Sequence, residues 1–192
     1  VNSLGGVGVY SLGQKIGNIT FTFMTAIQNV FAPQVYKLMF KMKEEGAASI
    51  GKYLTPFLYI SIAGGLVLAL FSEEVITLLT PKPFHGAIDI VSVLCLLYGT
   101  YFFGKQPQLI YARKTGLVSI LTLVGIVLNI GFNIPFIYWW GAIGAAWGTL
   151  VSGVISGFIY FYFSQKHYEI KWEYDKLIKI FVLFYGFTIS AM

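Results

Sequence analysis

The structural class of this protein follows from residues 116–163, which have the sequence GLVSILTLVGIVLNIGFNIPFIYWWGAIGAAWGTLVSGVISGFIYFYF. This stretch contains no charged residue, and Trp139, Trp140 and Gly141 divide it into two apolar segments. Each segment is long enough for a helix to cross about 30 Å of hydrocarbon, which takes roughly 20 residues. A Trp pair of this kind anchors helices at the lipid head groups, and glycine permits a tight turn. We therefore expect a helical hairpin in a membrane.

The rest of the chain has the same character. Apolar residues make up 57% of it and charged residues 11%, whereas a soluble domain has about 25% charged residues. We expect an all-α, polytopic membrane bundle of about six transmembrane helices, forming a single segment over residues 1–192. The predicted spans are residues 7–31, 53–71, 87–103, 116–138, 142–163 and 177–192.

Prolines and glycines set the expected ends of the first elements. Pro33 predicts the end of the first span, because proline fits poorly inside a helix. A short interfacial helix is expected in residues 36–52, broken at Gly46 and Gly51. A short interfacial turn is expected at 75–79, after the second span.

The positive charges predict an orientation. Of the 13 Lys and Arg residues, all except Lys15 and Lys82 lie in every second connector, and short basic loops stay cytoplasmic. Anionic lipid head groups account for these charges, so the net charge of +5 does not indicate a nucleic-acid partner. The basic connectors hold Lys37, Lys41, Lys43 and Lys52, then Lys105, Arg113 and Lys114, then Lys166, Lys171, Lys176 and Lys179.

The chain begins with Val1 and stops at Met192 inside an apolar run. We therefore expect it to be a piece of a longer protein, whose remaining helices would complete any functional site.

Polar residues of the first span follow a helical period. They step by three or four positions, which places them on one face of a helix, while the other positions are mainly apolar. Such a stripe is expected to line a water-filled cavity, although Ser, Thr and Asn also join membrane helices at about 0.6 kcal/mol per contact. The candidate cavity-lining residues are Ser11, Lys15, Asn18, Thr22, Thr25 and Asn29.

Lys15 is the charged member of this polar stripe. A charge inside a span is costly and is usually kept for a reason. An anionic substrate would offset that cost, but the ammonium could equally reach the surface by snorkelling or serve a structural pair.

Asn129 and Asn133 in the fourth span lie one turn apart and complete the set of candidate substrate-binding residues. Two amides at this spacing suit sugar hydroxyls, but they suit a neighbouring helix equally, or the carbonyl that Pro135 leaves without a donor. We favour the structural interpretation for this pair. In the fifth span, a row of small residues at every fourth position predicts close helix packing: Gly144, Gly148, Ser152 and Ser156.

Several chemistries find no support in the sequence. It has no Gly-rich phosphate loop ending in Lys and Ser or Thr, so we expect no nucleotide hydrolysis. We expect no catalytic residues, no metal site and no cofactor, because His85 and His167 fall on opposite sides and Cys95 has no partner cysteine. The chain is expected not to be an enzyme.

Three motifs together resemble a known family. They are GVGVYSLGQKI at residues 6–16, Phe31-Ala32-Pro33 at the expected helix end, and GAIGAAWGT at residues 141–149. In this order they are similar to the second lobe of polysaccharide flippases, the O-antigen and capsule repeat-unit translocases of the multidrug, oligosaccharidyl-lipid and polysaccharide exporter superfamily.

The resemblance implies a two-lobed secondary transporter in the bacterial inner (cytoplasmic) membrane. It would carry a polyprenyl-diphosphate-linked oligosaccharide from the cytoplasmic to the external leaflet by alternating access, for O-antigen, lipopolysaccharide or other cell-surface polysaccharide. Lys15 would face the diphosphate or an acidic sugar. Implied partners are this lipid-linked oligosaccharide, membrane lipids and other polysaccharide-assembly membrane proteins, with H⁺ or Na⁺ as a coupling ion. The alternatives are a drug or metabolite exporter of the same superfamily, or an integral-membrane enzyme of polysaccharide assembly.

Overall fold

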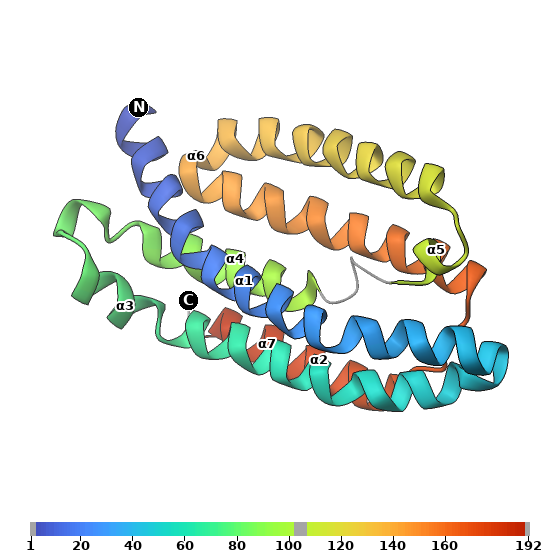
Figure 1. Cartoon of the computed structure of the whole chain (residues 1–192). Coiled ribbons are helices and arrows are strands. Elements are labelled where there is room, and N and C mark those ends of the chain that lie inside the picture. Colours follow the sequence, from blue (N-terminus) through green and yellow to red (C-terminus); the bar gives the residue numbers. More distant parts are fainter. Residues whose placement is uncertain (1–2, 102–106, 191–192) are drawn as a thin grey trace.

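The computed structural model describes residues 3–101 and 107–190, and in these residues the chain is helical, without a strand. Figure 1 shows long helices lying side by side. The elements are α1 (Ser3–Met42), η1 (Lys43–Gly46), α2 (Ala47–Leu70), α3 (Ser72–Leu79), η2 (Lys82–Phe84), α4 (Ala87–Thr100), α5 (Gln108–Tyr111), α6 (Thr115–His167) and α7 (Tyr174–Ser190).

The all-α prediction is therefore confirmed for this part of the chain, whereas the number of spans is not. By length and apolar composition, two of the described helices could cross a membrane, α2 and α6, and α4 is apolar but shorter. The helix α6 covers both the predicted fourth span and the predicted fifth span. Gly141, which has non-helical backbone angles, separates the two. The ends of the predicted third and sixth spans, and Lys105, lie outside the described residues.

Two predicted helix ends are wrong. The first helix does not stop at Pro33 but runs through it to Met42 as part of α1. A proline inside a helix removes one backbone hydrogen bond, and tertiary packing of Val35 and Met39, both fully buried, offsets this cost. Gly51 does not break a helix either, because it is buried within α2; the interruption occurs at η1, which ends at Gly46.

The hairpin predicted at Gly141 is present. This residue has φ 61° and ψ −133°, a backbone conformation open to glycine, and the two arms of α6 run back along each other (Figure 1). The row of small residues lies in the contact between the arms: a Cβ added to Gly148 would lie 3.0 Å from the Cα of Asn133, and one added to Gly144 would overlap the carbonyl oxygen of Phe136. The packing role of these two glycines is confirmed.

The first arm of α6 has a large exposed apolar surface. Leu123, Val127 and Ile134 expose 61%, 68% and 67% of their surface, and Trp139 and Trp140 are exposed beside the turn. Soluble proteins rarely expose large contiguous apolar patches, whereas lipid solvates such a face well. The surface of this arm indicates a lipid-facing helix.

The central element is α4, which packs against α1, α2, α6 and α7. Most of its residues are buried, including the run from Ile90 to Leu97. Cys95 belongs to this run and is fully buried, as expected for a packing residue. The side chains that each neighbouring helix packs against α4 therefore set the orientation of that helix.

The basic connectors converge at one end of the bundle (Figure 1). The backbone N–H of Lys171, in the segment between α6 and α7, donates to the carbonyl of Ala47 at 3.3 Å, where α2 begins. The amide of Gln108 in α5 donates to Gln165 Oε1 at 3.1 Å and to the carbonyl of Tyr168 at 3.4 Å. This convergence is the arrangement that the charge pattern predicts; which side of a membrane it faces stays a prediction.

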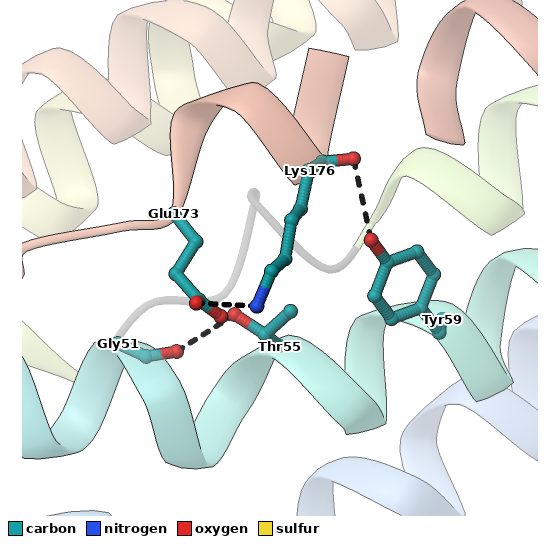
Figure 2. Close-up of polar contacts among 5 residues, drawn as sticks. All are labelled: Gly51, Thr55, Tyr59, Glu173 and Lys176. Carbon is teal, nitrogen blue, oxygen red and sulfur yellow. Dashed lines mark hydrogen bonds and ion pairs between the residues drawn. The ribbon is translucent and has the colours of Figure 1, made fainter. Parts of the chain in front are cut away.

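Polar contacts lie where α2 and the start of α7 are neighbours (Figure 2). Lys176 pairs with Glu173 at 2.5 Å, the Thr55 hydroxyl donates to the Gly51 carbonyl at 2.9 Å, and the Tyr59 hydroxyl donates to the Lys176 carbonyl at 3.5 Å. The hydrogen bond from Lys176 holds the pKa of the Glu173 carboxyl below its ordinary value. Of these contacts, the hydrogen bond from Tyr59 joins α2 to the start of α7, whereas the other two lie within each segment.

Gly51→Ala tests how closely these segments pack. A Cβ at this position would overlap the backbone carbonyl oxygen of Lys171, which cannot rotate away as a side chain could. We expect a loss of about 1–3 kcal/mol in the free energy of unfolding, measured by thermal or denaturant unfolding in detergent. Gly131→Ala is the matched control, because nothing lies within 4 Å of the added Cβ there. Equal stability of the two variants would contradict the packing.

Candidate functional site: the polar face of α1

The face of α1 that packs on α4 determines where the polar stripe lies. Gly13 and Gly17 leave room for α4: added Cβ atoms would lie 2.6 Å from Cγ2 of Ile90 and 3.1 Å from Cβ of Leu94. Thr20, one turn further, contacts Cys95 Sγ at 3.3 Å. These small residues therefore turn the opposite face of α1 away from the bundle.

That opposite face is the predicted polar stripe. Lys15, Asn18, Thr22 and Asn29 are exposed, and Ser11 and Thr25 are half-buried. The structure thus places all six on one side of α1, as their spacing predicts, and the described chain leaves this side largely uncovered. Their role in substrate binding stays a prediction.

The polar groups of the stripe differ in what they have available for a ligand. The hydroxyl groups of Thr22 and Thr25 donate to the carbonyls of Asn18 and Phe21, each at 2.9 Å, so their protons are already engaged by their own helix. The side chains of Lys15 and Asn18 make no hydrogen bond or ion pair within the described part of the chain. The cation and this amide are therefore available to a ligand or to another helix.

Lys15 dominates the electrostatics of this face. In sequence it is the single charged residue before Lys37, so no carboxylate on α1 balances it. In surroundings of low dielectric constant an uncompensated cation attracts an anion far more strongly than it would in water. The stripe is thus suited to a ligand that carries both negative charge and hydroxyl groups.

The structure does not bring Asn129 and Asn133 to this stripe. Both lie on the first arm of α6, and their amides bond the second arm: Asn129 donates to Ser152 Oγ at 3.1 Å, and Asn133 donates to Thr149 Oγ1 at 3.4 Å. Asn133 also donates to the carbonyl of Asn129 at 2.9 Å. Their hydrogen bonds join the hairpin, which is the interpretation favoured from the sequence.

A cavity of about 1190 Å³ lies between the end of α4, both arms of α6 and α7. Its lining is mainly apolar and includes Asn129 and Ser152, but it contains no residue of the α1 stripe. The cavity and the stripe are therefore separate features.

A second, smaller cavity of about 250 Å³ lies between α1, α5 and the second arm of α6. Asn29, the last member of the stripe, lines it together with Gln28, Tyr36 and Tyr160. These three residues are not among the predicted site residues, because the predicted stripe continues from Thr25 to Asn29 and the tyrosines fall outside or at the end of predicted spans. The seven-residue step from Asn29 to Tyr36 was an available signal, since it returns to the same helix face.

Three tyrosines pack against aromatic residues of α1. Tyr98 and Tyr101 contact Phe21 with ring centroids 5.5 and 5.6 Å apart. Tyr111 contacts Phe40 at 4.9 Å. These rings hold α4, α5 and α1 together.

The chain is similar to one curated protein whose name states a function. It is 24% identical over 176 residues to the "Probable low-salt glycan biosynthesis flippase Agl15" of Haloferax volcanii, and the match covers 89% of this chain. The chain spans 37% of the length of that relative. No family model and no solved structure matches the chain.

This similarity supports one part of the resemblance described from the sequence and leaves another part open. The relative is named as a flippase of glycan biosynthesis, which agrees with a flippase-like chain and with the expectation that it is not an enzyme. The name mentions neither O-antigen nor lipopolysaccharide, and the organism is an archaeon, so the similarity does not extend to a bacterial membrane.

Cysteine labelling tests whether water reaches the stripe. We expect Asn18→Cys and Thr22→Cys, placed singly in the intact protein on a Cys95→Ala background, to react with a membrane-impermeant maleimide, because both positions are exposed on the polar face. Thr20→Cys is the control and should stay unreacted, since Thr20 is buried against α4. Failure of both stripe positions to react would mean that another helix or lipid covers this face.

Proposed function

We propose that this chain forms part of a membrane flippase that moves a lipid-linked glycan across the bilayer. The observation that carries the proposal is the orientation of α1: Gly13 and Gly17 pack on α4, so Lys15 and the polar stripe face away from the described helices. A polar face with a cation inside an apolar chain needs an aqueous or anionic partner. The similarity to a protein named as a glycan biosynthesis flippase supports the same function.

The proposed substrate is a glycan on a polyprenyl diphosphate. Lys15 would bind the diphosphate, because a phosphate is the anion common to such carriers and a lysine binds it as a point charge. Asn18 and Asn29 would bind sugar hydroxyls, because amides offer both donors and acceptors.

Transport would proceed by alternating access around the stripe, from the cytoplasmic to the external leaflet. The stripe would meet a second lobe across a shared cavity, in a bundle whose six proposed spans here are residues 7–31, 53–71, 87–103, 116–138, 142–163 and 177–192. Binding that is equal in the two states gives no direction, so an ion gradient of H⁺ or Na⁺, or downstream use of the glycan, would supply it. We place the protein in the cytoplasmic membrane with its basic connectors inside, near any other proteins of glycan assembly.

Lys15→Ala in the intact protein tests this function. We expect it to slow flipping of a fluorescent polyprenyl-diphosphate-linked glycan in proteoliposomes by roughly tenfold or more, because a hydrogen bond to a charged group is worth about 1.5–3 kcal/mol. Lys15→Arg should retain most of the rate. Lys82→Ala is the control, because it removes an exposed lysine that lies in η2, outside the stripe.

Two outcomes would count against the proposal. Wild-type protein that does not flip the glycan lipid would contradict the function itself and would favour a drug or metabolite exporter. An unchanged rate in Lys15→Ala would contradict the role of the cation while leaving the transport activity in place.

A further inference from the structure

The smaller cavity contains a buried polar group without a partner. Gln28 is 9% exposed, and its Nε2 atom has no hydrogen-bond partner within residues 3–101 and 107–190. A buried amide left without a hydrogen bond costs about 1–3 kcal/mol. Gln28 lines the cavity, so a rotation of its terminal amide can turn this donor toward a molecule inside it.

The lining of this cavity indicates the chemistry of that molecule. Two amides, Gln28 and Asn29, and two phenols, Tyr36 and Tyr160, surround the space together with apolar groups such as Phe31 and Ile110. The cavity therefore has donors, acceptors and aromatic faces but no charged side chain in its lining. This combination suits a neutral ring that has hydroxyl groups at its edge and C–H groups on its faces, which is a sugar, and it does not suit a phosphate.

The size and position of the cavity agree with such a ligand. A volume of 250 Å³ corresponds to roughly eight water molecules in the liquid. Asn29 belongs both to the cavity and to the stripe, so the two are continuous along α1. Lys15 lies fourteen residues before Asn29, or roughly 21 Å along a helix. A diphosphate at Lys15 and a sugar in the cavity can therefore belong to one extended glycan lipid.

We propose that the cavity lined by Gln28, Asn29, Tyr36 and Tyr160 is a sugar subsite that binds a residue of the glycan remote from its diphosphate. This inference rests on the proposed flippase function and assigns its specificity for glycan to a site apart from Lys15. The connector end of the bundle, where α5 lies, is the predicted cytoplasmic end. The subsite would therefore bind the glycan as it enters the protein from that side.

The test compares two lipids that differ only in the sugar. Binding of polyprenyl diphosphate bearing a tetrasaccharide, and of polyprenyl diphosphate alone, is measured on the intact protein in detergent. We expect Gln28→Leu to weaken binding of the tetrasaccharide lipid by roughly three- to tenfold, the value of one or two neutral hydrogen bonds, and to leave binding of the sugar-free lipid unchanged. Gln34→Leu is the matched control, because Gln34 is an exposed glutamine of the same helix outside the cavity.

Each other outcome has a distinct meaning. Equal weakening of both lipids would show that Gln28 acts through the fold, and unchanged binding of both would show that the cavity holds only water; either overturns the subsite. Wild-type protein that binds neither lipid would overturn the flippase function together with the subsite. Tyr160→Phe keeps the ring and removes one hydroxyl, so it provides the same comparison if Gln28→Leu does not fold.

Discussion

The close approach of α1 to α4 is the constraint on which the rest of this structure depends. Two residues without side chains, Gly13 and Gly17, let Ile90 and Leu94 pack directly against the backbone of α1. Because a helix has a fixed number of residues per turn, fixing one face also fixes the opposite face. The orientation of the polar stripe is therefore a consequence of packing between small and branched side chains, and no polar contact is needed to produce it.

The amino-acid pattern was sufficient for those features that arise from local geometry. The helical class follows from the length of the apolar segments, and the turn follows from a glycine, Gly141, between two of them. The contact between the arms of α6 follows from small residues at every fourth position. The errors at Pro33 and Gly51 have a common cause: in each case a residue that weakens an isolated helix is held by distant segments. Val35 and Met39 are buried beyond Pro33, and the segment around Lys171 packs on Gly51. Such contacts join residues far apart in sequence, so local propensity does not contain them.

The candidate site also has one part that the sequence predicts and one part that depends on tertiary packing. The stripe from Ser11 to Asn29 lies on a single helix, so periodicity alone assembles it. The cavity at Gln28 draws its lining from α1, α5 and α6, and its character depends on an amide that lacks a partner only after the helices have packed. Asn129 and Asn133 show the converse, since polar residues that could serve a ligand are occupied by Ser152 and Thr149 across the hairpin.

The hairpin of α6 also constrains how the chain enters a bilayer. Because the turn at Gly141 is tight and the two arms pack closely, the pair would enter a bilayer as one unit. Within such a unit each asparagine already faces its partner on the other arm, so neither amide has to be dehydrated alone in hydrocarbon. In a bilayer, a polar pair that holds the folded hairpin together would therefore also lower the cost of inserting it.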